Sequence, residues 1–194
     1  MAQQGEPAAV RKPRADAARN HARLLATAKA VFATKGSQAS LDEIARIAGV
    51  GAGTLYRHFP NRDALVAAVF RNDTEQLVAA ADRIADTHPP LEALREWLLV
   101  FVDFVTAKQG MQELLEPILV GMSELKSESS ARMKQAASTL VHRAVASGDI
   151  KPDLDPMDLP LALVGVAKFS PDGDGAPAAR RLVDILIAGA RIAR

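Results

Sequence analysis

The chain has 194 residues, of which 48% are hydrophobic and 24% charged, and it contains no cysteine. This composition is typical of a globular protein, and the lack of cysteine excludes disulfides, thiolate metal sites and cysteine nucleophiles. No apolar run reaches the about 18 to 20 residues that cross a bilayer, and the N-terminus lacks a signal-peptide core, so we expect a cytoplasmic protein.

Charge is unevenly distributed along the chain. Residues 1–62 carry 10 Lys and Arg against 4 Asp and Glu, whereas residues 63–194 carry 14 against 19. A basic front on an acidic body is typical of a polyanion-binding module joined to a part that does not bind polyanions. Chance clustering would give the same counts, so charge alone does not decide the function.

The N-terminal residues predict a basic arm followed by a helix. Residues 1–15 have almost no large apolar side chain, so we expect them to be disordered. Their basic residues are Arg11, Lys12 and Arg14. A first helix is predicted from Asp16, its N-cap, to Lys35, because apolar residues recur on one face and Gly36 follows.

Two short helices are predicted between residues 40 and 60. Ser40 and Glu43 have the spacing of a capping box, which begins a helix that runs to Ala48. Gly49 permits a turn with positive φ, and the next helix covers Ala52–His58 before Pro60. Ala45, Gly49 and Leu55 supply a small residue for close helix approach, a turn glycine and an apolar anchor. This spacing predicts a helix-turn-helix, whose second helix enters a DNA major groove.

The remainder of the chain also has helical periodicity. One long helix is predicted over residues 62–87, ended by Pro89 and Pro90. Further helices are predicted over residues 91–107, 111–121, 127–147, 157–169 and 176–193. No run alternates like a strand. We therefore predict an all-α fold, with a helix-turn-helix domain at 16–61 and a larger helical domain for ligand binding and dimerisation at 62–194.

The string LDEIARIAGVGAGTLYRHFPNRDALVAAV closely resembles the DNA-binding domain of the TetR family of transcriptional regulators, over about residues 16–70. The segments PPLEALREWLLVFVDFV and SGDIKPDLDPMDL resemble an SbtR-type regulatory domain within that family. The resemblance implies a repressor that binds double-stranded operator DNA and responds to a small apolar or amphipathic ligand, without a cofactor.

The resemblance also assigns roles to individual residues. Ser40 would cap its helix and reach a phosphate, and Tyr56, His58 and Arg62 would contact the DNA backbone. The start of the recognition helix would face the base edges, with Gly51, Ala52, Gly53 and Thr54. Packing against the first helix is an alternative role for Tyr56 and for His58.

The recognition helix departs from the common family pattern at its start. Ala52 can offer only a methyl contact to thymine, and Gly51 and Gly53 supply no bidentate contact to a base. Base discrimination would then depend on Thr54, Arg57 and DNA shape, with the basic arm reaching a minor groove. Without DNA, Arg57 is expected to be solvated, and the arm can equally be a simple soluble tail.

Aromatic residues concentrate on one predicted helix of the larger domain. Trp97, Phe101 and Phe104 lie at i, i+4 and i+7, which indicates either a pocket wall or an ordinary core stripe. In the TetR family the middle helices of this domain surround the ligand. The resemblance therefore adds Met111, Leu115, Met122, Met133 and Phe169 as pocket candidates.

The two C-terminal helices are rich in aliphatic residues. The resemblance implies that they form a four-helix interface in a homodimer, whose two-fold symmetry would match a palindromic operator. A hairpin that buries its apolar faces within one monomer is the alternative.

Two other function classes compete with a DNA-binding regulator. No Ser/His/Asp set, phosphate-binding glycine loop or metal-spaced cluster indicates an enzyme or a metal site. The second alternative is a helical adaptor that binds anionic surfaces without reading DNA sequence. The basic residues cluster around the helix-turn-helix rather than beside a continuous apolar face, which disfavours a membrane-surface helix.

Overall fold

The computed structural model describes residues 13–169 and 175–192, with side chains from Ala17 onward. The secondary structure of these residues is helical, apart from an isolated bridge between Ile150 and Arg191. The helices are α1 (Pro13–Lys35), the 3-10 turn η1 (Gly36–Gln38), α2 (Leu41–Ile47), α3 (Ala52–His58), α4 (Arg62–Thr87), α5 (Pro90–Gln109), α6 (Gln112–Gly121), α7 (Ser123–Ala146), α8 (Asp158–Lys168) and α9 (Ala176–Ala190). The all-α prediction is confirmed. Residues 1–12 of the predicted disordered arm lie outside the described part of the chain. For residues 13–15 the prediction is wrong, because they belong to α1.

Three helix ends differ from the predicted ones by three residues or more. Helix α1 begins at Pro13 instead of Asp16, because a proline in the first turn lacks only an N–H that has no helical partner there. Helix α7 begins at Ser123, four residues earlier than predicted, and has the acidic Glu124 in its first turn. Helix α9 ends at Ala190, since Arg191 turns to an extended conformation and pairs with Ile150.

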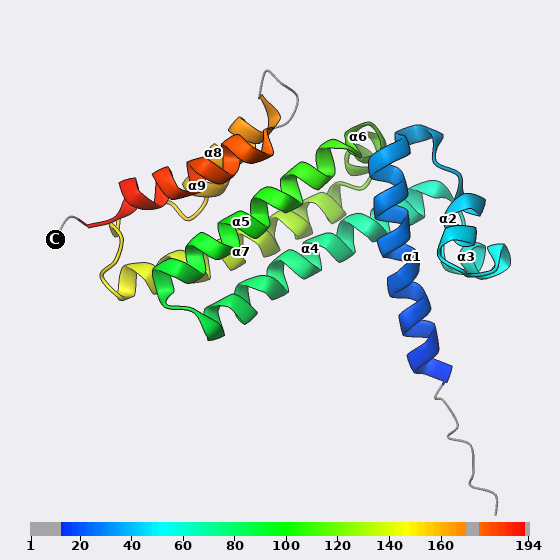
Figure 1. Cartoon of the computed structure of the whole chain (residues 1–194), viewed down its shortest axis with the longest axis horizontal. Helices are drawn as coiled ribbons and strands as arrows, with labels where there is room; N and C mark the ends of the chain where they lie inside the picture. The colour runs from blue at the N-terminus through cyan, green and yellow to red at the C-terminus, as the bar shows by residue number, and fades with distance from the viewer. Residues whose placement is uncertain (1–12, 170–174, 193–194) are drawn as a thin grey trace, which may run out of the picture.

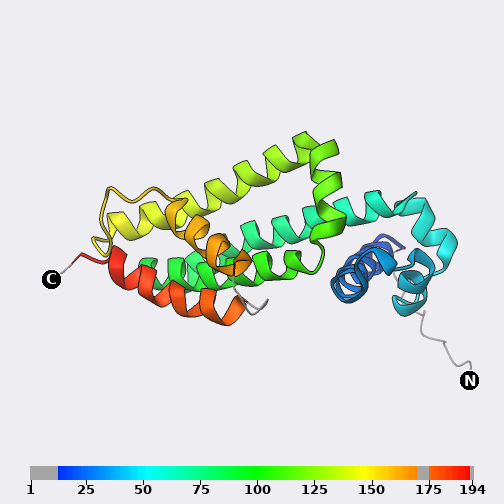
Figure 2. The same cartoon turned by 90° about the horizontal axis from the view of Figure 1, so that it is seen from above.

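The helices form an elongated body with a head at one end (Figures 1 and 2). Helices α4, α5 and α7 run side by side along the body and contact one another. Helix α1 crosses the N-terminal part of α4 steeply, and α2 and α3 pack beside it to complete the head. Helices α8 and α9 lie together against α5, away from the head (Figure 2). None of the described helices is long and apolar enough to span a bilayer.

Two hydrophobic cores meet along α4. The head core joins buried residues of α1 to α3 with Leu65 and Phe70 of α4, and it includes Leu115 of α6. The body core begins at Leu77 of α4 and contains Trp97 with much of α5, α7, α8 and α9. Helix α4 therefore contributes residues to both cores and connects the head to the body.

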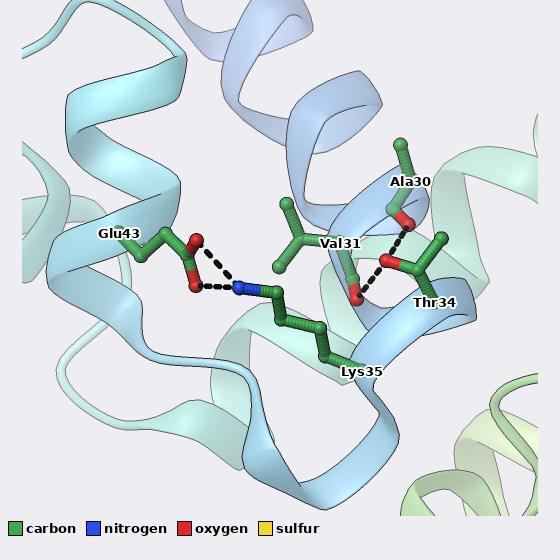
Figure 3. Close-up of polar contacts among 5 residues, drawn as sticks. All are labelled: Ala30, Val31, Thr34, Lys35 and Glu43. Atoms are coloured by element: carbon green, nitrogen blue, oxygen red, sulfur yellow. Dashed lines mark hydrogen bonds and ion pairs between the residues drawn. The ribbon is translucent and has the colours of Figure 1, made fainter.

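An ion pair ties α1 to α2 at the entrance of the helix-turn-helix (Figure 3). Lys35 Nζ lies 2.7 and 2.8 Å from the two carboxylate oxygens of Glu43. Ser40 occupies the N-cap position as predicted, but its side chain makes no capping hydrogen bond. The predicted capping box is therefore wrong in its bonding: the Ser40 side chain does not cap the helix, and the Glu43 carboxylate pairs with the Lys35 ammonium, a stronger charge-assisted interaction.

Candidate nucleic-acid interface and cavity

The connection between α2 and α3 has the geometry of a helix-turn-helix. Gly49 has a φ of +64°, a left-handed conformation that favours glycine. The amide of Val50 donates to the carbonyl of Ala45 at 3.0 Å, which closes the turn. Ala45 is 2% exposed and Leu55 is completely buried, so the small residue and the apolar anchor hold the two helices together as expected.

The start of α3 presents an open backbone to solvent. Gly51, Ala52 and Gly53 are exposed and Thr54 is half-buried. A methyl group added at Gly53 would meet no atom within 4 Å, so the surface here has no obstruction to a close approach. This end of α3 is therefore shaped for contact with a bulky surface through backbone and small side chains.

Two polar side chains on the exposed face of α3 make only light contacts within the protein. Tyr56 is 43% exposed, and its hydroxyl donates a long 3.4 Å hydrogen bond to Oδ1 of Asp42 in α2. Arg57 Nε donates to the carbonyl of Gly53 at 3.1 Å, which lays the guanidinium along its own helix. Both side chains can reorient at little cost, because each gives up one exposed hydrogen bond.

His58 and Arg62 are more strongly engaged within the head. The His58 ring lies 5.9 Å from the His21 ring of α1 in an edge-on arrangement, although His58 is exposed. The Arg62 guanidinium donates to the carbonyls of Ser37 and Ala39 at the end of η1. To reach a phosphate, Arg62 would have to leave these carbonyls, whereas Ser40 is exposed and needs no such rearrangement.

A cavity of about 510 Å³ lies where the two cores meet. Helices α4 to α8 all contribute to its wall, which includes Phe70 of the head core and Phe101 of the body core. Four of the pocket candidates line it, namely Phe101, Phe104, Leu115 and Met133. This volume is within the range of about 300 to 1,000 Å³ that is common for small-molecule sites.

The other four pocket candidates lie elsewhere. Trp97 is completely buried, and its indole Nε1 donates to the carbonyl of Leu77 at 3.0 Å, so it supports the wall from the core behind Phe101. Met111 is buried in the head core. Met122 and Phe169 end helices α6 and α8, are 43% and 84% exposed, and do not line the cavity. Helical periodicity places a residue on a face but does not locate the gap between faces.

Lys108 is a charged cavity residue that was not among the pocket candidates predicted from the sequence. Its Nζ lies over two aromatic rings, 3.9 Å from the centroid of Phe70 and 3.6 Å from that of Phe104. Burial lowers the pKa of Lys108 to about 7, and the nearby charge of Lys29 adds to this effect while that of Asp73 opposes it. The sequence feature that could have identified Lys108 is its position four residues after Phe104, which places a cation on the same helix face as the aromatic residues.

Comparisons with known proteins agree with this geometry. Residues 24–69 match the family profile of bacterial regulatory proteins of the tetR family, and residues 89–192 match the C-terminal domain of SbtR-like transcriptional regulators. The crystal structure of a TetR transcriptional regulator from Streptomyces coelicolor is similar with a TM-score of 0.79 and 38% identity, over 89% of this chain and 99% of that one. A TetR regulatory protein from Mycobacterium vanbaalenii gives a TM-score of 0.70 and 33% identity, over 92% and 99%.

A curated relative extends the comparison to sequence alone. The HTH-type transcriptional regulator SrpR of Pseudomonas putida is 31% identical over 155 residues, which are 75% of this chain and 70% of that protein. The chain belongs to the TetR family of helix-turn-helix transcriptional regulators and repressors, a DNA-binding and non-enzymatic family, and it carries an SbtR-like C-terminal domain.

Proposed function

We propose that the protein is a homodimeric, ligand-responsive repressor that acts in the cytoplasm on a palindromic operator. The observation that carries this proposal is the cavity at the junction of the two cores, because a molecule bound there touches both the head and the body. The alternative is that the basic front binds anionic surfaces without reading DNA sequence. Neither the family nor the exposed start of α3 has a feature that supports this alternative.

The DNA-binding surface would be the exposed face of α3 with the adjoining start of α2. The helix end at Gly51–Thr54 would approach base edges, while Ser40 and Tyr56 would contact phosphates on either side. The lack of long side chains at the first three of these positions supports readout by Thr54, Arg57 and DNA shape. His58 would act mainly by holding α3 against α1.

The outer face of α8 and α9 would form the dimer interface. Leu163 and Val183 are completely buried on the inner side of this pair, while Ile185 of α9 is 66% exposed on the outer side. A methyl group at Gly189 would meet no atom within 4 Å, so the outer surface is also smooth enough for close approach. The helices therefore bury one face within the monomer and leave a second apolar face for a partner.

Dimerisation can be tested with a charge placed on this face. Ile185→Glu should halve the mass measured by light scattering, because a carboxylate would be desolvated in the interface. Val120→Glu is the matched control, since Val120 is 80% exposed on α6, a helix that does not pack extensively against α8 or α9. A dimer that survives Ile185→Glu would contradict the proposed interface.

Two contacts would transmit a change in the cavity to the head. Lys29 of α1 forms an ion pair with Asp73 of α4 at 2.9 Å. The end of α5 also lies against α1, because a methyl group at Gly110 would be 3.0 Å from the carbonyl oxygen of Ala33. Movement of α4 or α5 around a ligand would thus displace α1 and change the separation of the two heads. A coupling of about 1 to 3 kcal/mol between the sites is typical for such a response.

DNA binding is tested by footprinting on the region upstream of the protein's own gene. The proposal expects a protected palindrome whose half-sites are one helical turn apart, about 34 to 36 Å. Protection that is no stronger than on random DNA of equal length would contradict sequence-specific binding.

A further inference from the structure

The cavity wall is apolar apart from a small set of charged and amide groups and the exposed hydroxyl of Ser130. Among the described residues that line it, the cations are Lys108, Lys126 and Lys168, and the one acidic residue is Glu116. Lys126, Lys168 and Glu116 are exposed and can be solvated at the rim, whereas Lys108 is half-buried. The amide of Gln112 is already bonded to Glu116 at 2.9 Å. Lys108 is therefore the charged group that a bound molecule would meet inside the cavity.

Lys108 has no carboxylate of its own among the described residues. The acidic group that acts on its charge is Asp73 of α4, which is 8% exposed and forms its ion pair with Lys29 of α1. The Lys108 ammonium instead lies over the rings of Phe70 and Phe104. Ring faces recover only part of the solvation that an ammonium loses on burial. An anionic partner at this position would supply the missing interaction.

The rest of the wall favours an apolar body. Phe101, Phe104, Val105, Leu115 and Met133 surround the space beside Lys108. Met133 is half-buried and unbranched, so it can adapt to the shape of a bound group. A hydrophilic anion such as free phosphate would leave this surface unused, and a neutral apolar molecule would leave Lys108 without a partner.

We propose that the cavity binds an amphipathic monoanion, whose acidic head pairs with Lys108 Nζ and whose apolar body packs against the aromatic wall. This inference rests on the proposed function in taking the cavity as the effector site, and it adds the chemical class of the effector. Pairing with the anion would also change the electrostatic surroundings of the Lys29–Asp73 pair, which joins α1 to α4.

The proposal predicts a dependence of binding on pH. Free Lys108 loses its proton as the pH rises through about 7, so the protein must take up a proton to bind an anion in mildly alkaline solution. The charged groups around it are Asp73 on α4, Lys29 on α1 and the rim residues on α6, α7 and α8. None of the described lining residues is a histidine, which leaves Lys108 as the group that titrates near neutrality.

A pair of fluorescent probes with one scaffold isolates the acidic head. The anion is 8-anilinonaphthalene-1-sulfonate, and the neutral partner is N-phenyl-1-naphthylamine, which lacks the sulfonate. Lys108→Met should weaken binding of the anion by about tenfold to a hundredfold, as is typical for loss of a charged hydrogen bond, and leave the neutral probe within about twofold. Lys134→Met, which removes an exposed lysine of α7 outside the cavity, should change neither affinity.

The conservative variant provides the second readout. Lys108→Arg keeps the charge at every accessible pH, so it should retain anion binding and abolish the roughly tenfold loss of affinity expected for the native protein between pH 6 and pH 8. The proposal is overturned if native protein does not bind the anion saturably, if Lys108→Met binds it unchanged, or if both probes are lost equally from a variant that still unfolds cooperatively. Operator footprinting is independent of these probes, so failure of the repressor proposal would be seen separately.

Discussion

Replacing Lys108 by methionine is expected to stabilise the protein in neutral and acidic solution. The pKa of Lys108 falls from its ordinary 10.5 to about 7, chiefly because burial disfavours the charged ammonium. Each unit of pKa corresponds to about 1.4 kcal/mol, so the upper limit of the destabilisation is about 5 kcal/mol. The side chain is only half-buried and solvent screens part of this cost, so we expect a gain of about 2 kcal/mol in Lys108→Met.

The sign of the pH dependence follows from proton binding. Between pH 7 and 10.5 the unfolded chain holds the Lys108 proton and the folded chain does not, so the free energy of unfolding of native protein rises with pH. The gain in the free energy of unfolding from Lys108→Met should therefore be largest at pH 6 and shrink toward pH 10. Urea unfolding of both proteins at these two pH values measures it, and a variant that is less stable at pH 6, or a difference independent of pH, would refute the reasoning.

Four further substitutions test the head and the core. Tyr56→Phe should weaken binding to operator and random DNA by the same factor, about fivefold in anisotropy titrations, because it removes one phosphate hydrogen bond. If Arg57 reads a base, Arg57→Ala should reduce the ratio of the affinities for operator and random DNA. Equal losses of affinity for both DNAs would exclude that role. Trp97→Ala should lower the free energy of unfolding by about 3 to 5 kcal/mol, since the indole is completely buried, and an unchanged urea midpoint would contradict its core position. Gly110→Ala should weaken operator binding, because its methyl group would lie 3.0 Å from Ala33 and displace α1, whereas Gly121→Ala, where space is open, should not.

Local patterns in the sequence predicted the architecture well for physical reasons. Apolar spacing and turn residues depend on neighbours within a few positions, and the helix-turn-helix at residues 41–58 is defined by such signals. The positive φ of Gly49 and the burial of Leu55 are confirmed. The family resemblance is confirmed as well. It could be predicted because the motif depends on residues only a few positions apart.

Side-chain partners could not be predicted in the same way. The capping box at Ser40 was lost to Lys35, a residue on another helix, and the Arg62 guanidinium was drawn to carbonyls about 25 residues earlier in the chain. Lys108 became a cavity residue only because α4 brings Phe70 beside it. Each of these outcomes depends on tertiary contacts that single-helix periodicity does not contain.

Footprinting on the DNA upstream of the gene would decide whether the protein binds a specific operator as a dimer. We expect two symmetric protected half-sites centred about 34 to 36 Å apart, with protection lost in Ile185→Glu at concentrations where Val120→Glu still protects. A single unpaired half-site protected equally by Ile185→Glu, or no protection beyond that of random DNA, would contradict it.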